Sequence, residues 1–325
     1  MLSIQSISFN YDNKTVLDSI NFDVEKGKHI AVMGESGCGK STLLKALYGL
    51  LTLNDGQITY NNEKLLGPEF HLVPGHPFMK YLSQDFDLMP YISSAQNVGA
   101  FLSNFYPEEK KRRTFELLEV VGMTEYAETH VRYLSGGQQQ RIALARVLAK
   151  EPEVLLLDEP FSQIDNFKKN ELRYRLFAYL KKQQITCITA THDKEDVLAF
   201  ADEIVVMKNG KQIVKDAPNQ LYNNPCYFYA ASLFAEVNTI NTSLFISDLN
   251  KEILLYPHEI SVSISSPVKA KVLNCYSQGN YYGLSIEANG KQLMIHSSKA
   301  YKVGTEIGIK CAISLLKKRP TVLPL

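Results

Sequence analysis

The sequence lacks a long hydrophobic run, a paired-cysteine motif and a charge excess. No apolar stretch approaches the roughly 18 residues that cross a bilayer, and no basic-then-apolar leader opens the chain, so we expect neither a membrane helix nor a secretory signal. The five cysteines are scattered without a CxxC pair, which disfavours a disulfide framework and a zinc site. Lys and Arg total 35 against 34 Asp and Glu, a balance that argues against nucleic acid as a partner. These absences indicate an intracellular protein in a reducing setting.

The pattern of apolar residues changes along the 325 residues and predicts two domains, 1–234 and 235–325. Alternating runs in the first 30 residues predict antiparallel strands, and the later alternation of helices and strands predicts a largely parallel α/β sheet. A helical region is expected at about 90–140, with the charged block 108–113 on a solvated face. Short β-rich runs after 235 predict a small all-β barrel or sandwich, ending in a solvated basic tail at 317–319.

A glycine-rich segment follows the apolar strand 30–33 and precedes an apolar helix. Residues 34–41 read GESGCGKS and match the phosphate-binding pattern G-x-x-x-x-G-K-S, so we predict a P-loop that binds a nucleoside triphosphate. The backbone N–H groups would surround the phosphates, Lys40 would reach the β- and γ-phosphates, and Ser41 would ligate Mg²⁺. A catalytic thiol at Cys38 is not expected. The predicted cofactor-binding residues here are Gly34, Glu35, Ser36, Gly37, Cys38, Gly39, Lys40, Ser41 and Thr42.

A second acidic site ends the apolar run 154–157. Asp158 stands where the carboxyl end of a parallel strand would hold Mg²⁺, directly or through water. Glu159 stands beside it and could act as the general base that polarises the attacking water. An acidic pair alone is a common strand ending, but the preceding P-loop makes a catalytic pair the better interpretation.

A third motif separates the possible classes of nucleotide-binding protein. Residues 134–138 read LSGGQ and precede a helix carrying Arg141, which resembles the signature of the ATP-binding cassette (ABC) family. The whole region 1–234 resembles that family's nucleotide-binding domain, a P-loop NTPase cassette with an antiparallel β subdomain and a helical subdomain. The resemblance implies an ATPase that binds ATP and Mg²⁺.

The resemblance also implies roles for single residues. Tyr11 looks like the aromatic that stacks on adenine, and Gln84 looks like the Q-loop glutamine, whose amide oxygen would coordinate Mg²⁺ or the attacking water. Residues 162–165 stand where the D-loop lies, with Ile164 in place of the usual leucine. His192 looks like the switch histidine, which would contact the γ-phosphate and hold the water. With Glu159, Gln84 and His192 are the predicted catalytic residues.

The family resemblance places the signature opposite the P-loop of a second copy, so two ATP molecules would lie within a head-to-tail homodimer. A hydroxyl and backbone N–H groups at a helix N-terminus suit an anion, which supports this prediction. The signature residues predicted to bind this nucleotide are Ser135, Gly136, Gly137 and Gln138.

The β-rich region 235–325 resembles the TOBE-like accessory domain of importer ATPases for ions and small solutes. Residues 255–260 are similar to its Arg-Pro-Glu element, with Tyr256 in place of the arginine. The cassette most resembles iron(III), polyamine and sulfate importer ATPases, with iron(III) as the leading cargo. The resemblance implies membrane permease subunits docking near 84–103, a solute-binding protein as an indirect partner, and a peripheral place on the cytoplasmic face of the membrane. The alternative is a regulatory or mechanical cassette acting on protein or nucleic acid; a plain kinase is remote.

Overall fold

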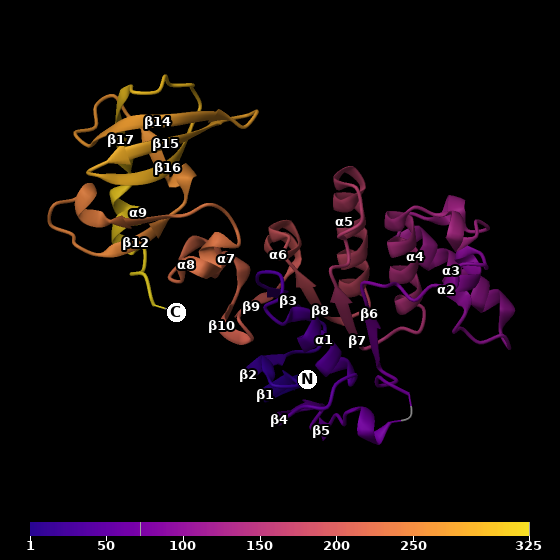
Figure 1. The fold of residues 1–325 in the computed structure, drawn as a ribbon. Coiled ribbons are helices and arrows are strands. Elements are labelled where there is room, and N and C mark those ends of the chain that lie inside the picture. Colours follow the sequence, from indigo (N-terminus) through magenta and orange to yellow (C-terminus); the bar gives the residue numbers. More distant parts are fainter. Residues whose placement is uncertain (72, 325) are drawn as a thin grey trace. The chain divides into compact units, whose positions relative to one another are not determined.

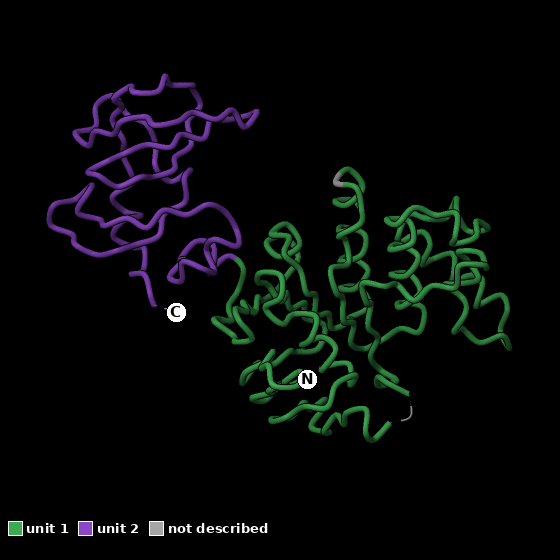
Figure 2. The backbone as a smooth tube through the Cα atoms, viewed as in Figure 1, with its two compact units in different colours: residues 1–218 green, residues 219–325 purple. Residues whose placement is uncertain are grey.

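The structure is a computed structural model that describes residues 1–71 and 73–324, and it divides into two compact units (Figure 2). The units are Met1–Pro218 and Asn219–Leu325. The helix α8 (Phe228–Ser232), which the sequence assigned to the first domain, therefore lies in the second unit. Its neighbour Phe234 packs edge-on against Tyr222 within that unit. The functional boundary at 234 stays a prediction.

A six-stranded sheet forms the centre of the first unit (Figure 1). Its order is β10-β9-β3-β8-β7-β6, and all neighbours are parallel except β10 and β9. The middle strands β3, β7 and β8 are buried along their whole length. This burial fits the mostly apolar sequences of β3 and β7, whereas β8 mixes threonine with less polar residues. The six strands are β3 (His29–Met33), β6 (Met79–Leu82), β7 (Val154–Asp158), β8 (Thr186–Thr191), β9 (Glu203–Lys208) and β10 (Lys211–Asp216). The predicted α/β class is confirmed.

An antiparallel sheet of order β2-β1-β4-β5 covers the helix that follows the P-loop. The buried positions of β1 include Leu2, Ile4 and Ile7, which share one core with helix α1. This sheet is the antiparallel β subdomain expected from the alternating N-terminal runs. Its elements are β1 (Leu2–Tyr11), β2 (Lys14–Val24), β4 (Asp55–Tyr60) and β5 (Glu63–Lys64), with α1 (Lys40–Tyr48) and the 3₁₀ turn η1 (Pro68–Phe70).

A group of helices lies beside the β6 and β7 end of the central sheet (Figure 1). Leu117, Leu118 and Val121, which gave the helical spacing in the sequence, are all buried in one core. The group contains α2 (Ser94–Gly99), α3 (Pro107–Val120) and α4 (Gly136–Leu148), with the turns η2 (Thr124–Tyr126) and η3 (Val131–Tyr133). Two further helices of the first unit are α5 (Asn166–Lys182) and α6 (Lys194–Phe200).

One residue of the charged block in α3 departs from its expected place. Arg113 is buried, and its guanidinium donates to the Tyr179 hydroxyl at 2.5 Å and to the Leu148 carbonyl at 3.2 Å. The expectation that the whole block 108–113 is solvated is therefore wrong at its last residue. These hydrogen bonds compensate the cost of removing the cation from water, and the bond to Tyr179 links α3 to α5.

The second unit contains a nearly closed antiparallel sheet of order β13-β17-β14-β15-β16, as expected for a barrel-like β domain. Its edge strands β13 and β16 also contact each other. Strands β11 and β12 form a separate pair. The strands are β11 (Asn238–Asn241), β12 (Glu252–Leu255), β13 (Ile260–Val262), β14 (Lys269–Ser277), β15 (Tyr282–Ala288), β16 (Lys291–Ser297) and β17 (Glu306–Cys311). The remaining elements are α7 (Pro218–Asn223), α9 (Ile313–Lys318), η4 (Thr242–Leu244) and η5 (Pro257–Glu259).

The basic segment 317–319 at the end of α9 is exposed at its two lysines but buried at Arg319. Arg319 is 1% exposed, and its guanidinium donates to the Glu259 carboxylate and to the Asn223 carbonyl. Glu259 belongs to the 255–260 segment, which the sequence analysis compared with an Arg-Pro-Glu element, and the cation that meets it is Arg319, 60 residues later. The expectation for 317–319 is wrong at Arg319 because the sequence does not show which carboxylate it meets.

Among the described residues, no helix is long and apolar enough to cross a membrane.

Candidate active site

The predicted site residues follow strands that are neighbours in the central sheet. Met33 pairs with Thr191, Asp158 pairs with Ala190, and Leu82 pairs with Leu157, all in parallel register. The carboxyl ends of β3, β8, β7 and β6 therefore meet at one edge of the sheet, which we call the catalytic edge because the predicted catalytic residues follow these strands. The P-loop, His192, Glu159 and Gln84 follow these four strands directly, at the edge where such sheets bind ligands.

The P-loop joins β3 to α1 and is packed tightly against its neighbours. A Cβ on Gly34 would lie 2.3 Å from the Met207 carbonyl oxygen, so only glycine fits that position. Gly39 has a φ of 108°, a left-handed conformation that suits glycine. Lys40 is buried, and its ammonium donates to the carbonyls of Gly34 at 2.7 Å and Glu35 at 3.0 Å. The loop is thus compact, because the Lys40 ammonium at its end is hydrogen-bonded to carbonyls at its beginning.

Cys38 lies in the loop as a buried thiol. Burial raises its pKa despite the nearby Lys40 ammonium, and a thiol with a raised pKa is a poor nucleophile. This chemistry agrees with the expectation that Cys38 is not catalytic.

Asp158 ends β7 and meets the first turn of α1. Its two carboxylate oxygens accept hydrogen bonds from the Ser41 hydroxyl at 3.0 Å and from the Tyr81 hydroxyl at 3.2 Å. Burial raises the pKa of Asp158, although these two bonds and the nearby lysines oppose the rise. The structure therefore brings together a hydroxyl oxygen of Ser41 and a carboxylate oxygen of Asp158, and Mg²⁺ binds oxygen ligands.

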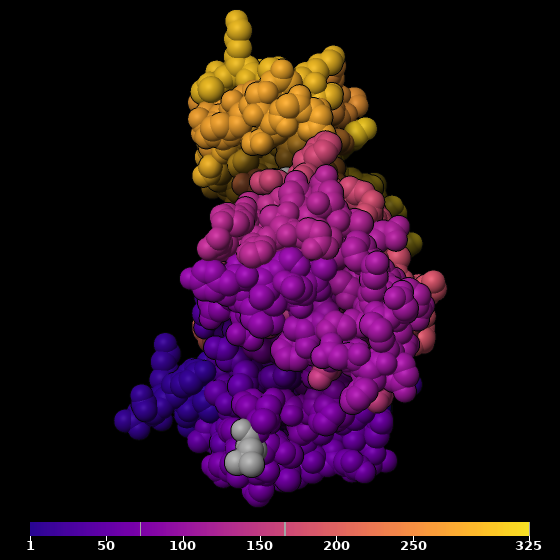
Figure 3. Space-filling model, turned by 90° about the vertical axis from the view of Figure 1, so that its right-hand side faces the viewer, coloured from indigo at the N-terminus to yellow at the C-terminus, as the bar shows by residue number. Residues whose placement is uncertain are grey.

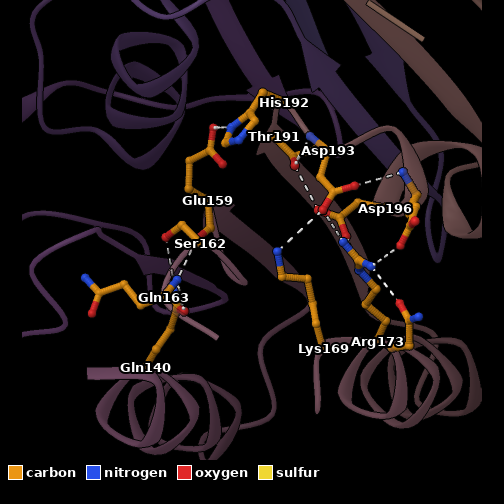
Figure 4. A network of polar contacts seen from close by, with 12 residues as sticks. Gln140, Glu159, Ser162, Gln163, Lys169, Arg173, Thr191, His192, Asp193 and Asp196 are labelled. Atoms are coloured by element: carbon orange, nitrogen blue, oxygen red, sulfur yellow. Dashed lines mark hydrogen bonds and ion pairs between the residues drawn. The ribbon is translucent and has the colours of Figure 1, made fainter. Parts of the chain in front are cut away.

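Glu159 and His192 are hydrogen-bonded at the same edge. Glu159 Oε1 lies 2.9 Å from His192 Nδ1, and the His192 side chain is 71% exposed (Figure 4). Glu159 has a φ of 50°, a conformation that residues other than glycine rarely adopt. Its backbone N–H donates to the Ala190 carbonyl at 2.9 Å, which fixes this turn onto β8. A carboxylate and an imidazole in contact can jointly hold a water molecule and accept its proton.

The signature segment begins α4 and packs against the 162–165 turn. Ser135 is the N-cap of α4, with its hydroxyl accepting from the Gln138 N–H at 3.4 Å in a capping box. A Cβ on Gly136 would lie 2.5 Å from Gln163 Oε1, and a Cβ on Gly137 would lie 2.6 Å from the Gln163 carbonyl oxygen. A shallow cavity of about 260 Å³ is lined by both segments, which places a helix N-terminus with free N–H groups beside open space.

Gln140 connects this turn to the catalytic edge and was not identified from the sequence. Its buried amide donates to the Glu159 carbonyl at 2.9 Å and accepts from the Gln163 N–H at 3.0 Å (Figure 4). It lies in a run of three glutamines, and nothing in that run distinguishes it. Tyr81 was missed as well, since a tyrosine on a strand is usually a packing residue.

Two predicted residues lie apart from the hydrogen-bonded centre. Gln84 is exposed in the loop after β6, and no hydrogen bond between described residues joins its side chain to Asp158 or Glu159. Tyr11 is 45% exposed at the end of β1 and packs edge-on against Phe9. A Cβ on Gly39 would lie 2.8 Å from the Val16 carbonyl oxygen, so β2, which pairs with β1, passes close to the P-loop. The roles given to Tyr11 and Gln84 stay predictions.

Comparison with known proteins identifies the family. A family model described as ABC transporter matches residues 17–162. The spermidine/putrescine import ATP-binding protein PotA of Clostridioides difficile (strain 630) is 30% identical and covers 95% of this chain and 94% of its own length. The chain belongs to the ABC transporter family. It is an ABC-type ATPase, which binds ATP and couples its hydrolysis to transport.

Solved structures of ABC cassettes share the fold of this member. CbiO1 of Clostridium perfringens, described as part of the ABC transporter complex cbiONQ, is 29% identical with a TM-score of 0.60 and covers 68% of this chain and 89% of its own. The cassette MJ0796, solved as a dimer in a post-hydrolysis state with ADP and phosphate, is 24% identical with a TM-score of 0.60. It covers 67% of this chain and 99% of its own, and at this identity it supports the fold alone.

Proposed function

We propose that this ABC ATPase is the energy-supplying subunit of a membrane importer for polyamine-type solutes. The observation that carries the proposal is the similarity to the spermidine/putrescine importer protein, which extends over 95% of the chain and so includes the β unit. No comparison reported above supports iron(III), the cargo that the sequence analysis favoured. A polyamine cargo therefore replaces it. The cargo itself would be held by other subunits.

The site supplies the groups that ATP hydrolysis needs. The N–H groups of residues 34–39, with Lys40, Ser41 and Thr42, would bind the phosphates, and Tyr11 would stack on adenine. Ser41 and Asp158, which are in contact, would ligate Mg²⁺, with Gln84 as a further oxygen ligand. The bound metal would neutralise charge on the phosphates. Glu159 would take the proton of the attacking water, and His192 would hold that water and the γ-phosphate.

A second copy of the chain would complete each site. Ser135, Gly136, Gly137 and Gln138 present a capped helix N-terminus beside open space, which suits the phosphates of a nucleotide on another subunit. The chain would then act as a head-to-tail homodimer around two ATP molecules.

The surface near residues 84–103 offers a place for permease subunits. A groove of about 620 Å³ is lined by α2, α3 and the loop before them, and includes Met89, Ile92 and Phe115. Tyr91 and Phe101 nearby are 72% and 54% exposed. Figure 3 views the protein from the side on which α2 and α3 lie in Figure 1. Docking there would place the ATPase peripherally on the cytoplasmic face of the membrane, with a solute-binding protein as an indirect partner.

The experiment that tests this proposal is uptake of labelled spermidine and labelled iron(III) by host cells lacking the chain. Wild-type protein should restore spermidine uptake, and Lys40→Ala protein should not, because it loses the ammonium that binds phosphate. If the protein restores iron(III) uptake and not spermidine uptake, the polyamine cargo is refuted while the importer function still stands. Unchanged uptake of both solutes, with ribosomes or DNA co-purifying, would favour the regulatory alternative.

A further inference from the structure

Arg173 of α5 is the largest fully buried polar side chain near the catalytic edge, at 2% exposed. Its guanidinium donates to carboxylates of all three acidic residues that follow His192 (Figure 4). The bond to Glu195 measures 2.8 Å, and closer contacts reach Asp193 and Asp196. A planar fork of five donors suits this arrangement, whereas a lysine could not reach three carboxylates in fixed directions.

These contacts hold the chain on both sides of His192. The Thr191 hydroxyl donates to Asp196 Oδ2 at 2.8 Å and accepts from the Asp193 N–H at 3.0 Å. The residues before and after His192 are therefore both bonded to the cluster around Arg173. His192 itself points away from the cluster and contacts Glu159 at 2.9 Å (Figure 4).

The cluster depends on the single buried cation at its centre. Asp196 is 3% exposed in its side chain, and burial raises its pKa to about 6 even with Arg173 beside it. Lys169 lies 3.6 Å from Asp193 but does not contact Asp196 in the described structure. Without the Arg173 guanidinium, the buried carboxylate would lose its charge partner and the segment 191–196 would shift toward water.

The helix α5 also connects the His192 segment to the 162–165 turn. The helix begins directly after the 162–165 turn, whose backbone packs against Gly137 and is bonded to Gln140. Arg173 thus links α5, the helix that follows the 162–165 turn, to the segment that carries His192.

We propose that Arg173 is a positioning residue for ATP hydrolysis, which holds the segment 191–193 so that His192 stays in contact with Glu159. The proposal rests on the role of His192 given under the proposed function. Arg173 does not touch the reacting atoms, and its effect on turnover passes through His192.

The test is a double-mutant cycle of Arg173→Lys and His192→Ala in the full chain, measured as kcat and KM for ATP. Arg173→Lys should lower kcat by about 10- to 100-fold with KM changed less than about 2-fold, because misplacing a reacting group by about 1 Å has that effect. In the His192→Ala background the same substitution should add no further loss. Arg175→Lys is the matched control, because Arg175 lies on the same helix and is 45% exposed in its side chain.

Each other outcome contradicts the proposal. If the fold-losses in kcat from the two substitutions multiply in the double variant, Arg173 acts on the fold in general and does not position His192. An unchanged kcat for Arg173→Lys excludes a positioning role. A wild-type rate for His192→Ala overturns the role of His192 in the proposed function, and the role of Arg173 with it. If Arg173→Lys does not fold, Asp193→Asn replaces it in the same cycle, because that side chain is 27% exposed and keeps its shape.

Discussion

At the scale of single residues, the two acidic residues of the catalytic edge are held by hydrogen bonds to residues of other elements. Asp158 is fixed by Ser41 and Tyr81, and Glu159 is fixed by the bond from its own N–H to Ala190 and by its contact with His192.

His29 is the first residue of β3 and lies buried against the Phe177 ring, with 4.5 Å between the ring centroids. Its ring bonds to the Phe200 carbonyl at 2.9 Å.

His29 should make the stability of the fold depend on pH. Burial lowers its pKa from 6.5 to about 4, so the folded chain keeps it neutral while the unfolded chain binds a proton below pH 6.5. The free energy of unfolding should therefore fall as the pH drops from about 6.5 to 4, by up to about 3 kcal/mol. Urea unfolding at pH 7 and pH 5 measures this difference.

The control for this measurement is another histidine of the first unit. His29→Gln should remove most of the fall between pH 7 and pH 5, whereas His130→Gln, at an exposed position, should leave it unchanged. An equal fall in wild type and His29→Gln would show that other groups cause it.

At the scale of elements, local motifs were predictable and long-range contacts were not. The P-loop, the acidic strand end and the capped signature helix each lie within about ten residues, so their residue types reveal them. Tyr81 meets Asp158 77 residues later, and Arg173 meets Asp196 23 residues later. No periodicity marks such partners, because the fold alone brings them together. The buried places of Arg113 and Arg319 were missed for the same reason.

The close packing of α4 on the 162–165 turn predicts that Gly137 is irreplaceable. Gly137→Ala places a Cβ 2.6 Å from the Gln163 carbonyl oxygen, a backbone atom that must move. ATP turnover should fall about 10-fold or more, because the turn lies beside the segment that carries Glu159. Gly283→Ala is the control, since its Cβ would meet nothing within 4 Å. Equal phosphate release by both variants would contradict this account.

The buried ion pair of the second unit predicts a loss of stability when one partner is removed. Arg319→Met leaves Glu259, 15% exposed in its side chain, without its cation and should destabilise that unit by about 3–5 kcal/mol. Hydrogen exchange of peptides from β12 to β17 measures the change. Adding Glu259→Gln should restore much of the protection, and Lys318→Met should have little effect. A double variant as unstable as Arg319→Met alone would refute the pairing argument.

At the scale of the whole molecule, one chain combines a cassette that hydrolyses ATP with a separate β unit. The fold class and the order of the catalytic motifs were predictable, because both follow from hydrophobic patterns and local spacing. The division at Pro218 differs from the expected boundary because α8, read as part of the first domain, packs in the second unit, where its Ala231 shares a small core with Leu254 and Tyr256. The cargo was not predictable, since the proposed site would bind a nucleotide and the cargo would be held by other subunits.

The most direct test of the central claim compares phosphate release by wild-type and Glu159→Gln protein with ATP and Mg²⁺. Removing the carboxylate that we propose as acceptor of the water proton should lower release by about 100-fold or more. ATP binding should be kept, and stable homodimers should form with ATP. Glu153→Gln, just before the opposite end of β7, is the control and should hydrolyse normally. A Glu159→Gln protein that releases phosphate at the wild-type rate would contradict the assignment of the catalytic base.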